Sequence, residues 1–257
     1  MAESRIFKGE NAPLLFGHRG CPQLAPENTL PSFNEILIHK VPGVELDVQI
    51  CRSGELVVFH DNNMDRMTGH NGNVLDSDIS LIRSLDCGSR FSKKFTGEKI
   101  PLFEEVLQLL GDKVYYDIEL KSDYLKNRGL EKKVFEMLKD FNLENRVLIS
   151  SFNPVSLMRI KRLSKDIPLS LIYSNTSEIP LLMRRGEGRF FQKNCSIKPD
   201  HRFLSKKLFQ NLSRKYEVMT WTVDDEDLFK QFTQWDISGL CTNRADYFIS
   251  REFVDQE

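Results

Sequence analysis

The chain has 257 residues, 40% of them hydrophobic and 28% charged, which is the composition of a globular protein with a sizeable core. Its 36 Lys and Arg nearly balance 37 Asp and Glu, which excludes a basic field for nucleic acid, and its 5 scattered cysteines form no C-x-x-C pair, which favours reduced thiols. No stretch approaches the roughly 20 apolar residues that span a bilayer and the opening residues lack a signal core, so we expect a cytoplasmic protein without a transmembrane segment.

Short β-rich runs alternate with segments of helical periodicity along the whole chain. The predicted strands cover residues 14–18, 44–50, 114–120, 146–151, 169–174, 195–199, 217–223 and 237–242. The predicted helices cover residues 31–40, 101–110, 130–141, 154–163, 177–185, 205–215 and 225–235, and Thr29 is expected to cap the first of them. About eight strand–helix units in about 250 residues favour an α/β fold of the TIM-type (β/α)8 barrel over an open doubly wound sheet.

One long segment interrupts this alternation. Residues 54–61 read as a hairpin that extends the second strand unit, and a polar, glycine-dotted stretch follows over approximately 61–98. Such a length exceeds an ordinary connection, and long loops on barrels are usually lids or small subdomains. Because no linker or low-complexity run divides the chain, we expect a single domain over residues 1–257 with this small insertion after the second strand unit.

Cationic and imidazole side chains follow several predicted strands. His18 and Arg19 end the first strand, His60 follows the apolar run LVVF, and Lys121 comes directly after the third strand. In a barrel, the carboxyl ends of the strands face the active-site mouth. We therefore expect these four side chains to meet at one mouth.

Three acidic residues lie on the same strands. Glu45 and Asp47 share one face of the second strand by its two-residue period, and Glu119 lies near the end of the third. A buried carboxylate pair among aliphatic neighbours would repel unless a cation lay between its members. The three together predict a site of hard oxygen ligands for Mg²⁺ or Ca²⁺, since zinc would favour the histidines.

A divalent cation, an arginine, a lysine and two histidines are the parts that handle a phosphate ester. The metal and the guanidinium stabilise charge on phosphoryl oxygens, and histidines move protons near neutral pH. Cleavage of a phosphodiester needs a base for the attacking oxygen and an acid for the departing alkoxide. Two histidines on opposite sides would serve both roles.

A set of motifs in chain order carries a family resemblance. The motifs are GHRG (17–20), PENT (26–29), ELD (45–47), VVFHD (57–61), DRMTGHNG (65–72), KIPLFEEVL (99–107), IELK (118–121) and WTVDDEDLFKQF (221–232). Together they resemble the glycerophosphodiester phosphodiesterase family over nearly the whole chain. The resemblance implies a TIM-type barrel that hydrolyses glycerophosphodiesters to sn-glycerol 3-phosphate and an alcohol with a divalent metal ion.

The resemblance also implies roles for individual residues. His18 and His60 would be the acid/base pair, with Glu45, Asp47 and Glu119 as metal ligands, Arg19 and Lys121 on the phosphate, and Trp221 against the glycerol backbone or headgroup, unless Trp221 is a core residue. We add Glu27 of the PENT turn as a support that fixes Arg19. Asn243 stands where the family usually has an acidic residue and is expected to accept a hydrogen bond, and Lys198 is expected near the mouth.

Several alternatives stay open at this level. The glycerol 2-hydroxyl would attack phosphorus to give a cyclic phosphate, or water would attack directly. The same site would also suit a phospholipase D-like lyase or hydrolase acting on lysophospholipids, for which Phe91 and Phe95 would line a hydrophobic groove. A catalytically silent phosphate-binding barrel is the alternative outside enzymes.

Overall fold

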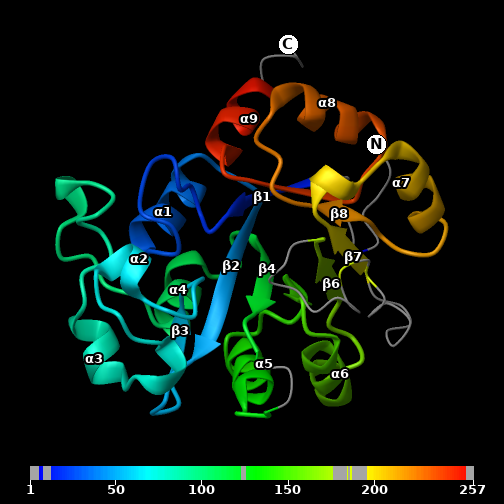
Figure 1. The fold of residues 1–257 in the computed structure, drawn as a ribbon. Coiled ribbons are helices and arrows are strands. Elements are labelled where there is room, and N and C mark those ends of the chain that lie inside the picture. Colours follow the sequence, from blue (N-terminus) through cyan, green and yellow to red (C-terminus); the bar gives the residue numbers. More distant parts are fainter. Residues whose placement is uncertain are drawn as a thin grey trace.

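The computed structural model describes residues 6–7, 13–122, 126–175, 184, 186 and 196–252. Within these ranges, parallel strands surround a central axis and helices cover them outside, as Figure 1 shows. The parallel strands are β1 (Leu14–His18), β2 (Gly43–Ile50), β4 (Tyr115–Leu120), β5 (Val147–Ser151), β6 (Leu169–Tyr173), β7 (Ser196–Pro199), β8 (Met219–Thr220) and β9 (Gly239–Thr242).

The strands form one sheet in the order β7-β6-β5-β4-β2-β1-β9-β8. Parallel bridges from Ile197 to Val218 and from Asp200 to Trp221 join the two ends of this order. The sheet therefore closes on itself, which confirms the predicted TIM-type barrel. The predicted strand 217–223 is shortened to β8, because beyond Thr220 the chain keeps only the single bridge from Trp221 to Asp200.

The outer helices bury one face each against the strands. They are α1 (Leu30–Ile38), α4 (Phe103–Leu110), α5 (Leu130–Asp140), α6 (Pro154–Leu163), α7 (Lys206–Leu212), α8 (Glu226–Gln234) and α9 (Ala245–Glu252). Thr29 caps α1 by accepting from the Ser32 amide, as predicted. The predicted helix 177–185 lies largely outside the described residues, and α9 was not predicted.

The insertion begins with a hairpin that leaves the barrel at β2. Strand β3 (Leu56–Val58) pairs antiparallel with β2, which confirms the predicted hairpin. After it come α2 (Asp65–Thr68), the 3-10 turn η1 (Val74–Asp76), α3 (Ile79–Ser84) and the 3-10 turn η2 (Lys93–Phe95). Met64, Val74 and Ile82 are fully buried in a small apolar cluster of this segment. The insertion therefore has its own packing beside the barrel (Figure 1).

The structure describes four of the five cysteines. Cys21, Cys51, Cys87 and Cys241 are buried free thiols, and Cys195 lies outside the described residues. Among the helices in the described ranges, none has the length and hydropathy that crossing a bilayer requires.

Candidate active site

A cavity of about 930 Å³ opens at the carboxyl ends of the barrel strands. Its lining includes His18, Arg19, Glu45, His60, Glu119, Lys121 and Trp221. Asp47 and Glu27 do not line the cavity, but each forms an ion pair with Arg19, which does. The structure thus brings every sequence-predicted site residue to one place.

The three carboxylates lie side by side on neighbouring strands. Asp47 on β2 is the register partner of Glu119 on β4, and Glu45 lies two residues before Asp47 on the same face. One oxygen atom from each of these buried carboxylates lies within 4.8 Å of the others. Lys121 Nζ approaches Asp47 Oδ1 at 3.0 Å and Glu119 Oε1 at 2.5 Å.

Burial and neighbouring charges shift the pKa values of two of these carboxylates in opposite directions. Burial, followed by the negative charge of Asp47, raises the pKa of Glu45 well above its usual value. Burial also opposes ionisation of Asp47, but the charges of Lys121, His60 and Arg19 outweigh it and hold the pKa of Asp47 well below its usual range. Asp47 Oδ1 is buried and, although Lys121 Nζ is 3.0 Å away, makes no well-directed hydrogen bond. A hard divalent cation fits this set of oxygen atoms.

The H-R-G turn positions Arg19 at the cavity through its backbone. Arg19 and Gly20 have φ angles of 58° and 92°, and a Cβ at Gly20 would lie 2.3 Å from Ser32 Oγ, so only glycine fits there. The Arg19 amide donates to Glu45 Oε2 at 3.0 Å. Its carbonyl accepts from Ser32 Oγ at 3.1 Å and from the Asn28 amide at 2.9 Å. The strained turn is thereby fixed to both β2 and α1.

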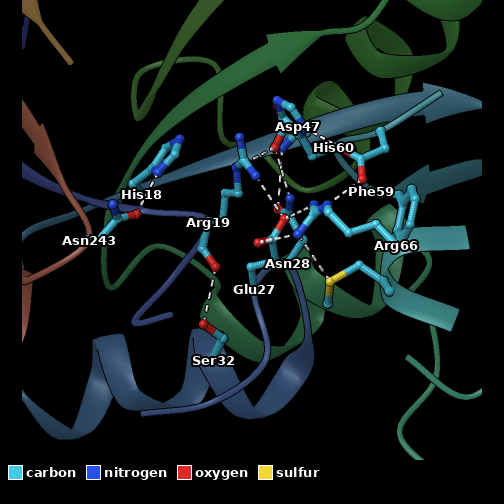
Figure 2. A network of polar contacts seen from close by, with 12 residues as sticks. His18, Arg19, Glu27, Asn28, Ser32, Asp47, Phe59, His60, Arg66 and Asn243 are labelled. Atoms are coloured by element: carbon cyan, nitrogen blue, oxygen red, sulfur yellow. Dashed lines mark hydrogen bonds and ion pairs between the residues drawn. The ribbon is translucent and has the colours of Figure 1, made fainter. Parts of the chain in front are cut away.

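The Arg19 side chain lies between two carboxylates. Its Nη1 donates to Glu27 Oε1 at 2.8 Å, and its Nε lies 3.5 Å from Asp47 Oδ2 (Figure 2). The buried Nε has no hydrogen-bond partner among the described residues. The guanidinium is therefore held between Glu27 and Asp47, with its buried Nε facing the Asp47 carboxylate.

His18 is a neutral imidazole with one defined tautomer. Burial, followed by the charge of Arg19, lowers the pKa of His18 to about 3. Its Nδ1 lies 2.7 Å from Asn243 Oδ1, and Asn243 Nδ2 donates to Asp224 at 2.7 Å, which fixes the amide with its oxygen toward the ring. Because an amide oxygen only accepts, Nδ1 carries the proton. Nε2 then presents a lone pair, 3.8 Å from Glu45 Oε2.

His60 has a different partner. Its Nδ1 lies 2.7 Å from Asp61 Oδ1, and its side chain is about one-third exposed, against 14% for His18. Burial opposes ionisation of Asp61, but hydrogen bonds from His60 and Arg66 hold the pKa of Asp61 well below its usual range. One histidine of the cavity thus bonds an amide and the other a carboxylate.

Three residues of the site were given no role by sequence reasoning. Asn28 adopts a φ of 55° and donates from Nδ2 to Asp47 Oδ2 at 2.8 Å. Lys198 lines the cavity and donates to the buried Asp117 at 2.6 Å. Arg66, which belongs to the DRMTGHNG motif, bonds both Glu27 and Asp61. Lys198 was expected near the mouth, where it lies, and the PENT asparagine was a detectable signal, since Asn tolerates the left-handed conformation.

Trp221 belongs both to the cavity and to the packing around it. Its ring lines the cavity and packs edge-on against Phe152, with centroids 5.6 Å apart. Its Nε1 donates to the Lys198 carbonyl at 3.0 Å. The indole at the cavity wall is therefore held in place by both contacts.

The fold and the cavity define an α/β barrel with a polar site at the carboxyl ends of its strands, and comparison with known proteins gives the family. The model of the glycerophosphoryl diester phosphodiesterase family matches residues 18–247, and the chain belongs to this family. A glycerophosphodiester phosphodiesterase of Caldanaerobacter subterraneus subsp. tengcongensis is 33% identical, over 92% of this chain and 96% of its own length. One from Bacillus altitudinis is 30% identical, over 90% of this chain and 95% of its own.

Solved structures show the same fold. A phosphodiesterase of Oleispira antarctica, determined in complex with the product sn-glycerol-3-phosphate, has a TM-score of 0.78 at 24% identity and covers 95% of this chain and 97% of its own. A glycerophosphodiester phosphodiesterase of Agrobacterium tumefaciens has a TM-score of 0.74 at 22% identity, with 92% and 98% covered.

Proposed function

We propose that the chain hydrolyses glycerophosphodiesters to sn-glycerol 3-phosphate and an alcohol, with His18 and His60 as the acid/base pair. The supporting observation is the convergence of three carboxylates, two histidines, Arg19 and Lys121 on one cavity, in a chain of this family. The sn-glycerol-3-phosphate bound to the Oleispira antarctica relative accords with this product.

Glu45, Asp47 and Glu119 would hold the divalent cation, which is Mg²⁺ or Ca²⁺ by its oxygen ligands. When bound, the cation supplies positive charge that stabilises the developing negative charge on the phosphoryl oxygens. Lys121, clamped by Asp47 and Glu119, adds a second positive charge at the same place. Arg19 offers its guanidinium, fixed by Glu27, to a phosphate oxygen.

The two histidines divide the proton transfers. His18 presents a bare Nε2 and so accepts the proton of the attacking hydroxyl, while Asn243 keeps its Nδ1–H in place. His60, whose Nδ1 faces Asp61, donates a proton from Nε2 to the departing alcohol oxygen. Either the glycerol 2-hydroxyl or water is the attacking group. If the 2-hydroxyl attacks, a cyclic phosphate forms and water opens it with the histidine roles reversed.

The lysophospholipid alternative has no observation in its favour. Phe91 and Phe95 pack against each other at 5.6 Å within the insertion, and in the described part of the chain neither lines the cavity. Soluble glycerophosphodiesters are therefore the proposed substrates.

The test is release of sn-glycerol 3-phosphate from glycerophosphocholine, with Mg²⁺, with Ca²⁺ and with EDTA. We expect metal-dependent release that is lost in Glu45→Ala and His18→Ala. His39→Ala, which changes a histidine outside the cavity lining, is the matched control. Phosphorus NMR at short times separates the routes, because cyclic glycerol phosphate appears only if the 2-hydroxyl attacks. Metal binding without turnover of any diester headgroup would instead indicate the silent phosphate-binding barrel.

A further inference from the structure

Arg66 reaches from helix α2 of the insertion to the mouth of the barrel. Its Nη2 and Nη1 donate to Glu27 Oε1 at 2.6 Å and to Oε2 at 3.1 Å, and its Nε donates to Asp61 Oδ2 at 2.6 Å. One guanidinium thus bonds two carboxylates that are separated by 34 positions in the sequence, Glu27 to Asp61. The planar fork of arginine suits such a bidentate arrangement, which lysine cannot reproduce.

Each of these carboxylates has a second partner inside the site. Glu27 Oε1 also accepts from Arg19 Nη1 at 2.8 Å, and Asp61 Oδ1 lies 2.7 Å from His60 Nδ1. Arg19, Glu27, Arg66, Asp61 and His60 therefore form one continuous chain of polar contacts, part of which Figure 2 shows. The chain has the phosphate-side arginine at one end and a proton-transferring histidine at the other.

The Arg66 side chain is 48% exposed, while its two carboxylate partners are more shielded. Arg66 is also absent from the cavity lining in the described part of the chain. Arg90 from the same insertion donates to the carbonyls of Asp65 at 2.8 Å and Arg66 at 3.2 Å, which steadies the backbone that carries the guanidinium. Arg66 therefore contacts the carboxylates that hold Arg19 and His60 while lying outside the cavity lining.

We propose that Arg66 is a positioning residue that sets Arg19 and His60 at the same time, through Glu27 and Asp61, and so couples the insertion to both halves of the reaction. The inference rests on the proposed function, because it assigns Arg66 a task in that same site. Loss of the guanidinium would leave Glu27 held by Arg19 and Asp61 held by His60, without the bond that fixes both carboxylates relative to each other. Phosphate binding and protonation of the leaving group would then suffer together.

A purely structural role would attach the insertion to the barrel without affecting these groups. Arg52 supplies a matched control, since its Nε donates to Asp78 Oδ1 at 2.8 Å where both side chains are well exposed. Arg52→Gln removes one arginine–carboxylate pair that involves the same insertion but leaves the cavity untouched. We expect it to keep wild-type kcat and KM.

The experiment measures kcat and KM for glycerophosphocholine in Arg66→Gln, Glu27→Gln, Asp61→Asn and the double variants. We expect Arg66→Gln to lower kcat about tenfold to hundredfold, the scale of a misplaced catalytic group, and to raise KM. Adding Glu27→Gln or Asp61→Asn to Arg66→Gln should cost much less than the same change costs alone, because the coupled contacts are already lost. Arg66→Lys should be intermediate, since it retains the charge but not the fork.

Chemical rescue gives a readout that stability does not affect. Millimolar guanidinium should restore part of kcat in Arg66→Ala and none in Arg52→Ala. Wild-type kinetics in Arg66→Gln, additive losses in the double variants, or no rescue in a folded Arg66→Ala would each overturn the inference while leaving the proposed function standing. A wild-type chain that releases no sn-glycerol 3-phosphate from any diester would overturn both.

Discussion

Replacing Lys198 by methionine is expected to destabilise the barrel by about 3–5 kcal/mol, because it leaves Asp117 as a buried charge without its cation. Lys198 Nζ lies 2.6 Å from Asp117 Oδ2, and the two side chains are 3% and 0% exposed. Burial acts to lower the pKa of Lys198, but the Asp117 carboxylate outweighs it and raises that pKa above the usual value. Lys198 is therefore held in its charged form beside this carboxylate in the folded protein.

The size of the effect follows from this geometry. At 2.6 Å the gross attraction is about 6 kcal/mol for an effective dielectric constant of about 20, and desolvation of both ions offsets much of it. Without Lys198, the hydrogen bond from Ser150 Oγ at 2.6 Å still serves Asp117 Oδ1, but Oδ2 loses its ion pair. For a domain of this size the loss corresponds to a Tm lower by about 6–20 °C.

Urea unfolding followed by circular dichroism measures the free energy of unfolding. Lys132→Met is the control, because its Nζ lies 3.6 Å from Glu136 on an exposed helix face, and it should change stability by less than about 0.5 kcal/mol. Lys198→Met combined with Asp117→Leu should regain most of the loss, since it removes both buried charges. A cost below about 1 kcal/mol for Lys198→Met alone would refute the reasoning that the pair is buried and ionised.

Three further outcomes follow from the site and the core. His18→Ala and His60→Ala should each lower kcat by about 100- to 10,000-fold without loss of folded structure by circular dichroism, and near-normal rates in either would refute its role. Because burial and the neighbouring charge raise the pKa of Glu45, the folded state binds its proton more tightly than the unfolded state. In EDTA the free energy of unfolding should therefore fall as pH rises above 4.5, the usual pKa of glutamate. Urea titrations at pH 5.5 and 8 measure this fall, which should be smaller in Glu45→Gln. An equal fall in the variant and the wild type contradicts this. Burial raises the pKa of the Cys87 thiol to about 12, so a thiol reagent at pH 8 should modify it only after unfolding, as mass spectrometry of the labelled peptide will show.

The elements that the sequence predicts well are those with a strict period. Glu45, Asp47 and Glu119 could be placed together because side chains alternate along a strand and parallel strands end at one rim. His18 followed from the same rule, since it ends β1. His60 instead follows β3, which is antiparallel to β2, and it reaches the site because the hairpin brings Phe59 back beside Asp47. Local periodicity therefore suffices for residues that the barrel itself carries.

The rest depends on conformations that periodicity does not encode. Asn28 reaches Asp47 because the PENT turn places it at a φ of 55°, and Arg66 reaches Glu27 because α2 of the insertion lies next to that turn. The last predicted strand before α8 was too long, since residues 221–223 continue its apolar pattern without pairing as a strand. Contacts between side chains on different loops depend on the tertiary structure, so the spacing of residues in the sequence does not predict them.

The closure of the barrel between β7 and β8 has a consequence for motion. In the described part of the chain, two isolated bridges join these strands. Two side-chain hydrogen bonds complete the junction: Thr220 Oγ1 donates to the Pro199 carbonyl at 2.8 Å, and Trp221 Nε1 donates to the Lys198 carbonyl at 3.0 Å. Junctions with few backbone hydrogen bonds open locally at lower free energy than the rest of a sheet. Deuterium should therefore enter the amides of this seam before those of β2 and β4, and a molecule resting on Trp221 should slow that uptake.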